Sequence, residues 1–234
     1  MDPPRRRFMA QSLIFLSNPT VIDTMPHIVL LGDSIFDNAS YTGGKPDVIT
    51  QLRDIVPPDW KATLLAVDGA TTGGIPSQLA RMPSDASHLI LSVGGNDALG
   101  RSDILDKPAR STAEAFTMLA RVTREFEDAY RKTVAICLRQ KVPLTLCTIY
   151  NGNFPDADFQ QRATAAVAVF NDAIIRVGAE NRLTVIELRR VCDKPEDYAN
   201  PIEPSSIGGA KIARAILRVA SDSGDTGYLA RVTA

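Results

Sequence analysis

The sequence has few of the side chains from which metal sites and disulfide frameworks are built. It holds two histidines, His27 and His88, and three cysteines in 234 residues. Two histidines exclude a His-rich metal centre, and no Cys and His spacing is typical of a metal site, so we expect no metal and no cofactor. Because Cys137, Cys147 and Cys192 are odd in number and widely spaced, they indicate buried thiols in a reducing compartment.

The sequence also lacks strong net charge and long apolar runs. Its 26 Lys and Arg residues nearly balance 27 Asp and Glu residues, which gives a formal net charge of -1. Such a chain has no global basic field to hold nucleic acid or an anionic membrane. No run near the N-terminus approaches the roughly 20 apolar residues of a membrane span. At 44% hydrophobic and 23% charged residues, the composition is that of a globular protein with one core. It gives no indication of the oligomeric state.

The first 24 residues differ from the rest of the chain. Arg5-Arg6-Arg7, followed by a short apolar run at residues 12–16, has some likeness to a twin-arginine export signal, but no small-x-small cleavage site precedes Met25. We therefore expect residues 1–24 to be an extension outside the core and the protein to be cytoplasmic. Two alternatives stay open: export through this weak signal, and a true start at Met25.

From Met25 onward, apolar runs typical of buried strands alternate with segments of helical periodicity. The strands are predicted at residues 27–31, 62–67, 88–93, 142–149 and 183–188, and the helices at 47–56, 77–82, 111–140, 159–178 and 207–220. This alternation predicts an α/β fold: a single three-layer α/β/α domain over residues 25–220, with a five-stranded parallel sheet in the flavodoxin-like order 2-1-3-4-5. Residues 221–234 are predicted to be a weakly held C-terminal tail.

Two of the predicted helices carry clear local signals. Ser111 and Glu114 are spaced as a capping box, in which each side chain can bond the backbone N–H of the other residue. In the helix at 159–178, Phe159, Ala163, Ala166 and Phe170 recur at helical spacing. This spacing predicts an apolar face that is directed toward the core.

Polar and glycine residues follow the first three predicted strands. These strands end in Gly32-Asp33-Ser34, Asp68-Gly69 and Gly94-Gly95-Asn96-Asp97. The carboxyl ends of parallel strands lie on one edge of the sheet, about 4.8 Å apart, so the three turns can surround one substrate atom. There Ser34 supplies a hydroxyl, Gly69 a backbone N–H and Asn96 an amide donor. A nucleophile with converging neutral donors is what acyl transfer requires, whereas each turn alone would indicate only a turn.

These segments resemble the blocks of the GDSL, or SGNH, hydrolase family. Gly32-Asp33-Ser34-Ile35 is similar to the first block, Gly69 to the glycine of the second, and residues 94–97 to the third. The resemblance spans residues 28–220. It implies ester hydrolysis through an acyl-enzyme on Ser34, with Asn96 in the oxyanion hole. The G-x-S-x-G elbow of α/β-hydrolases is a poor match.

The chain departs from the family pattern in the last block, which reads Asp-x-x-His followed by proline. Pro204 aligns with that proline, but Glu203 stands where the family has its histidine and Asn200 where it has its aspartate. His27 and His88 cannot substitute, because both open strands and lie roughly 20 Å from the edge that carries Ser34.

Two hypotheses remain. In the first, the protein is a serine esterase for a small or carbohydrate-linked ester, with Glu203 as the base. Burial would raise its pKa toward 6–7, and the neutral Asn200 would donate a hydrogen bond to its carboxylate. In the second, Glu203 only caps or solvates the next helix, and an impaired SGNH-like protein binds an ester or sugar without turnover.

The surroundings of the site are predicted more coarsely. Asp33 and Asp97 are expected to bond turn amides. Loops at residues 36–44, 100–110 and 151–158 are expected to shape the pocket, since loops at this edge follow strands. Their mixed composition includes no apolar lid that would argue for long lipids.

Overall fold

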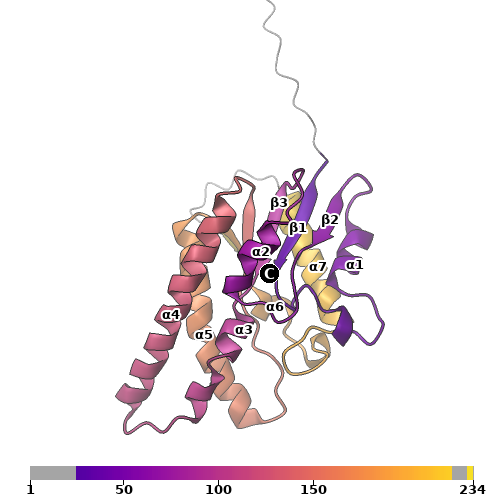
Figure 1. Cartoon of the computed structure of the whole chain (residues 1–234). Helices are drawn as coiled ribbons and strands as arrows, with labels where there is room; N and C mark the ends of the chain where they lie inside the picture. The colour runs from indigo at the N-terminus through magenta and orange to yellow at the C-terminus, as the bar shows by residue number, and fades with distance from the viewer. Residues whose placement is uncertain (1–24, 223–230, 234) are drawn as a thin grey trace, which may run out of the picture.

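The protein folds around one parallel sheet (Figure 1). The computed structural model describes residues 25–222 and 231–233. Its strands follow the order β2-β1-β3-β4-β5-β6, with β1 His27–Gly32, β2 Lys61–Leu64, β3 His88–Ser92, β4 Leu144–Cys147, β5 Thr184–Ile186 and β6 Arg231–Thr233. The order 2-1-3-4-5 and the α/β class are therefore as predicted. The predicted extension at residues 1–24, with its twin-arginine-like segment, lies outside the described residues.

The sixth strand corrects the five-stranded prediction. Within the predicted tail, β6 pairs in parallel with β5, with Thr184 opposite Arg231. Only three residues form the strand, and Val232 is half exposed. An edge strand of this kind lacks the buried apolar run by which the other strands are recognised.

Helices cover both faces of the sheet. One layer holds α2 Ile75–Leu79, α4 Thr112–Leu138 and α5 Ala157–Glu180, and the other holds α1 Val48–Ile55, α6 Leu188–Val191 and α7 Ser206–Ser221. Val29 and Leu31 pack in the first layer and Ile28 and Leu30 in the second. Because β1 is buried on both faces, its sequence is a continuous apolar run. No helix among residues 25–222 combines the length and hydropathy needed to cross a membrane.

The capping box at α4 forms only in part. The Ser111 hydroxyl accepts the N–H of Glu114 at 3.1 Å, as predicted. The Glu114 carboxylate, however, accepts the N–H of Arg110 at 2.7 Å, together with its guanidinium. The ion pair with Arg110 explains why the carboxylate is drawn to that residue instead of to the Ser111 N–H.

The two long helices outreach the sheet that they cover. At 1.5 Å per residue, the 27 residues of α4 span about 40 Å, whereas the five residues of β3 span only about 16 Å. Since α4 and α5 run back against the strands, their first turns project beyond the carboxyl edge of the sheet (Figure 1).

The farther halves of α4 and α5, which the sheet supports, are joined firmly. The rings of Phe126 and Phe170 lie 5.0 Å apart, and Arg176 on α5 pairs with Glu127 on α4 at 2.8 Å. These contacts lie on the sheet side of the projecting turns.

Candidate active site

The turn after β1 is fixed against β3. Gly32 has φ +139°, and a Cβ added there would lie 1.8 Å from the Ser92 carbonyl oxygen. The same oxygen accepts the N–H of Asp33 at 3.2 Å. Only glycine permits this approach, because it combines a positive φ with the absence of a side chain. The hydroxyl of Ser34 is thereby held at the carboxyl edge of the sheet.

Ser34 and Glu203 meet at that edge. The Ser34 hydroxyl donates to Glu203 Oε1 at 3.1 Å, and the two residues are only 7% and 5% exposed. Glu203 Oε2 is buried and has no hydrogen-bond partner among the described residues. The structure contradicts the alternative in which Glu203 caps or solvates the next helix. Ser205 caps α7 instead, since its hydroxyl accepts the N–H groups of Ile207 and Gly208.

The surroundings of Glu203 raise its pKa to about 7. Burial is the largest cause, because it disfavours the charged carboxylate, and the negative charge of Asp68 acts in the same direction. The hydrogen bond from Ser34 opposes both effects by stabilising the ionised form. Near neutral pH this carboxylate is a far better proton acceptor than an exposed glutamate.

The loop that carries Glu203 is held by hydrogen bonds from two buried side chains that the sequence did not indicate. The Tyr150 hydroxyl donates to the Ile202 carbonyl at 2.6 Å. Asn38, which is fully buried, donates from Nδ2 to the Pro204 carbonyl at 3.1 Å and accepts the Val48 N–H at 3.0 Å. These bonds tie the glutamate loop to the turn after β1 and to the start of α1.

Asn200 does not have the contact that was predicted for it. Its Oδ1 accepts the N–H groups of Ile202 at 2.9 Å and Glu203 at 3.0 Å, and the residue is exposed. No described contact joins its amide to the Glu203 carboxylate. Asparagine readily bonds the backbone two residues ahead, and here that local turn outcompetes a bond to the carboxylate. Asn200 therefore shapes the backbone that presents Glu203.

The turns after the first three strands carry three candidate donors. The backbone N–H groups of Ser34 and Gly69 have no acceptor among the described residues, and Gly69 has φ +75°. Asn96, in the short helix α3 Gly95–Leu99, donates one amide hydrogen to the Ala70 carbonyl at 3.0 Å. That bond joins the second and third strand ends, and the other amide hydrogen of Asn96 has no acceptor among the described residues.

The two aspartates of the turns bond amides as expected, but one of them does more. Asp97 accepts the N–H and hydroxyl of Thr72, and Asp33 accepts the N–H of Ile35 at 3.1 Å. Asp33 is also only 2% exposed, and its pKa is raised to about 7, chiefly by burial and also by the negative charges of Glu203 and Asp97. Sequence position alone did not indicate this second neutral-range carboxyl.

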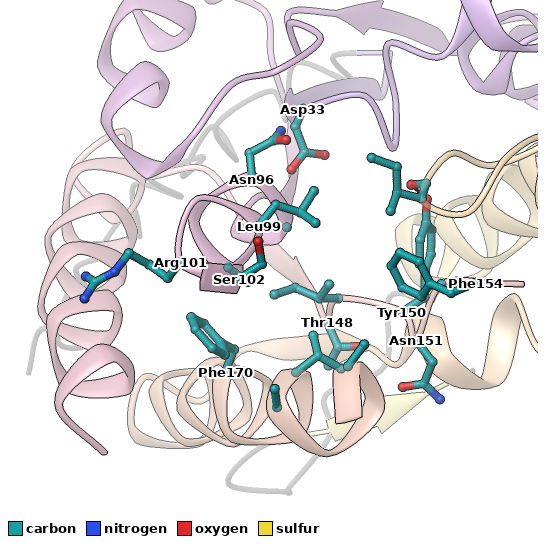
Figure 2. A pocket seen from close by; sticks show the side chains of 18 of the residues that line it. Asp33, Asn96, Leu99, Arg101, Ser102, Thr148, Tyr150, Asn151, Phe154 and Phe170 are labelled. Atoms are coloured by element: carbon teal, nitrogen blue, oxygen red, sulfur yellow. Dashed lines mark hydrogen bonds between the residues drawn. The ribbon is translucent and has the colours of Figure 1, made fainter. Parts of the chain in front are cut away.

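A cavity of about 130 Å³ has Ser34 and Glu203 in its lining. Figure 2 shows this pocket from close by. It extends between α3, the 3₁₀ segment Ser102–Asp106, α4 and α5. The predicted loops at 100–110 and 151–158 contribute to its wall, whereas the loop at 36–44 does not. The wall is mostly apolar, with side chains such as Leu99, Phe154 and Phe170 directed at the space. Sequence analysis missed this cavity because many of its apolar residues come from helices, whose apolar faces were expected to meet the core.

Both histidines lie at the other end of the sheet. His27 opens β1, where Nδ1 contacts Asp85 at 2.8 Å and Nε2 contacts Thr63 at 2.8 Å. His88 opens β3, and its ring stacks with Trp60. Neither borders the cavity. Across the described part of the chain, no group of three or more His, Cys, Asp or Glu side chains has the arrangement of a metal site.

Comparison with known proteins decides the family. The model of the GDSL-like lipase/acylhydrolase family matches residues 30–208, which is most of the chain. The chain belongs to this family. No curated protein sequence matches it.

Solved structures agree with GDSL-like membership at the level of the fold. An extracellular lipase from Streptomyces rimosus superposes with a TM-score of 0.63 at 15% identity, over 84% of this chain and 100% of the lipase. A phospholipase A1 from Streptomyces albidoflavus NA297 gives 0.60 at 13% identity, over 84% and 99%. An acetyl xylan esterase gives 0.61 at 15% identity, over 82% and 98%. Membership of this GDSL-like family supports ester hydrolysis in general.

Proposed function

We propose that the protein is a serine esterase in which Glu203 is the general base in the position usually held by histidine. The observation that carries this proposal is the 3.1 Å hydrogen bond from the Ser34 hydroxyl to a buried carboxylate. A serine hydroxyl becomes a useful nucleophile when a base within hydrogen-bond reach accepts its proton as it attacks.

The first half-reaction forms an acyl-enzyme. Glu203 Oε1 accepts the Ser34 proton while Oγ forms a bond to the ester carbonyl carbon. Negative charge then develops on the carbonyl oxygen, for which the N–H groups of Ser34 and Gly69 and the amide of Asn96 are the available donors. When the tetrahedral intermediate collapses, the C–O bond to the alcohol breaks and the proton on Glu203 passes to the departing oxygen.

The second half-reaction releases the acid. Glu203, again ionised, accepts a proton from water as the water oxygen attacks the acyl carbon. Collapse breaks the bond to Ser34 Oγ, which regains its proton from Glu203. Each cycle therefore consumes one ester and one water and returns the enzyme unchanged.

The replacement of histidine by glutamate also removes the need for an orienting aspartate. A histidine base needs a carboxylate to fix its tautomer and stabilise the imidazolium. A glutamate becomes neutral on protonation, and a second carboxylate would repel its ionised form. Here the carboxylate is held through its backbone, by Asn200 on one side and by the Tyr150 bond to Ile202 on the other.

The test is turnover of short p-nitrophenyl esters by wild-type protein, Ser34→Ala and Glu203→Gln. We expect both variants to lose at least about 10³-fold in kcat, since nucleophile and base act as a unit. Glu196→Gln alters an exposed glutamate that precedes the same loop and should retain wild-type kcat. If wild-type protein has no turnover and Glu203→His acquires it, the protein is a binding protein and the proposal is wrong.

A further inference from the structure

The cavity beside Ser34 is formed where the long helices pass the edge of the sheet. The apolar face of α5 has two environments. Its second half, with Phe170, Ala173, Ile174 and Val177, is buried in the core. In its first half, Ala163, Ala166 and Val167 are only partly buried and line the cavity. Within residues 25–222 and 231–233, no strand lies behind these first turns, so the face that was predicted to meet the core borders the cavity instead (Figure 1).

Small side chains keep that space open. Ala163 and Ala166 lie one helical turn apart on α5, and Leu119 and Val122 line the same cavity from α4. The alanine side chains of α5 are too short to fill the space that they line. At Phe170 a ring fills the gap and ends the cavity against the core.

We propose that this cavity holds the acyl chain of the ester, an unbranched apolar chain of about six carbons. The inference rests on the proposed function and names its substrate class. The cavity measures about 130 Å³, and an apolar cavity of about 150 Å³ accommodates the six carbons of benzene. The sequence predicted only a small or carbohydrate-linked ester, and the present proposal specifies the acyl group.

The distribution of polar groups assigns the acyl chain, and not the alcohol, to the cavity. Outside the cavity, near Glu203, the Tyr41 hydroxyl donates to Asp68 at 2.7 Å in an exposed pair. The alcohol that is released from the ester can therefore pass into solvent beside these polar groups. Arg101 borders the cavity, but its side chain is directed away from the space and pairs with Glu125, which leaves a mostly apolar wall that favours a hydrocarbon (Figure 2).

Chain-length dependence of kcat/KM tests the assignment. For p-nitrophenyl esters from acetyl to decanoyl, we expect kcat/KM to rise about fourfold for each methylene group that is buried, and to stop rising near six carbons. Ala166→Phe should abolish this rise, so that kcat/KM no longer increases with the length of the acyl chain. The matched control is Ala165→Phe, because Ala165 is on the same helix but exposed. Ala163→Leu is a smaller filling of the same space, should Ala166→Phe fail to fold.

A binding measurement separates this inference from the proposed function. Hexanamide is a neutral, unreactive mimic of the acyl group, and acetamide is its short control. Hexanamide should raise the Tm of wild-type protein and Ala165→Phe but not of Ala166→Phe, and acetamide should raise none. Stabilisation by hexanamide without any turnover would support the chain site and refute the esterase. Turnover that favours acetyl esters and is indifferent to Ala166→Phe would overturn the chain site and leave the esterase standing. If the protein shows no turnover and hexanamide does not stabilise it, both the esterase proposal and the chain site are refuted.

Discussion

The rate of ester hydrolysis should fall about tenfold between pH 8 and pH 6. Only the ionised form of Glu203 can accept the Ser34 proton, and burial holds its pKa at about 7. At pH 8 about nine-tenths of the carboxylate is ionised, at pH 6 about one-tenth and at pH 5 about one-hundredth. An exposed glutamate would be almost fully ionised at pH 6 and would give nearly the same rate as at pH 8.

The assay is kcat/KM against pH, measured in a pH-stat so that the released acid is detected directly. Asp68→Asn removes a negative charge that raises the pKa of Glu203, so the acid limb should move to lower pH. Asp33 also has a pKa of about 7, so the acid limb of the wild-type pH profile reflects the coupled titration of Asp33 and Glu203. Asp33→Asn should leave a limb that reflects the titration of Glu203 alone.

Two results would refute the reasoning. A rate that stays constant from pH 8 to pH 5 would mean that no buried carboxylate acts as the base. The second result is an acid limb of the kcat/KM profile that disappears in Asp33→Asn and does not move in Asp68→Asn. It would assign the titration to Asp33 and would mean that Glu203 is not the catalytic base.

Three further predictions concern stability, each measured by urea unfolding. Gly32→Ala should destabilise the fold by at least about 3 kcal/mol, because the added Cβ would clash with the backbone of Ser92. Gly69→Ala should cost only about 1 kcal/mol, because its Cβ would meet open space and only the positive φ is unfavourable. Equal losses of stability would contradict this account. Asn38→Leu should cost about 3 kcal/mol, since two buried backbone groups lose their partner, and a loss below 1 kcal/mol would mean that they find another. The raised pKa of Asp33 means that the folded state binds its proton more tightly than the unfolded state, so stability falls as pH rises from about 4 to about 7. Between pH 5 and pH 8, wild-type protein should therefore lose about 3 kcal/mol more than Asp33→Asn, and identical pH profiles would show that Asp33 is not perturbed.

The sheet and the meeting of Ser34 with Glu203 were accessible from the sequence, because both follow from strong local signals. An apolar run that ends in Gly32 predicts a buried strand with a tight turn, and parallel strands place such turns on one edge. The family block around Pro204 then places Glu203 near the hydroxyl. Geometry of this kind depends on order along the chain and needs no detail of side-chain packing.

The features that escaped prediction depend on competition between contacts. Asn200 was able to bond either a carboxylate or its own turn, and only the folded loop decides between them. Helical spacing placed Ala166 on an apolar face, but whether that face meets a core or an open space depends on how far α5 outreaches the strands. The strand β6 depends on an edge left available by β5, which three ordinary residues do not reveal.

The projection of the first turns of α4 and α5 beyond the sheet also has a consequence for local opening of these helices. The ring pair of Phe126 and Phe170 and the pairing of Arg176 with Glu127 fasten only the supported ends, and within the described residues no ion pair bridges the first three turns of α4 and α5. The projecting ends should thus exchange their amide hydrogens with solvent sooner than the fastened ends. A hydrocarbon chain bound between these ends would add apolar contacts that join them and would slow that exchange. The projecting ends would therefore be more rigid when substrate is bound.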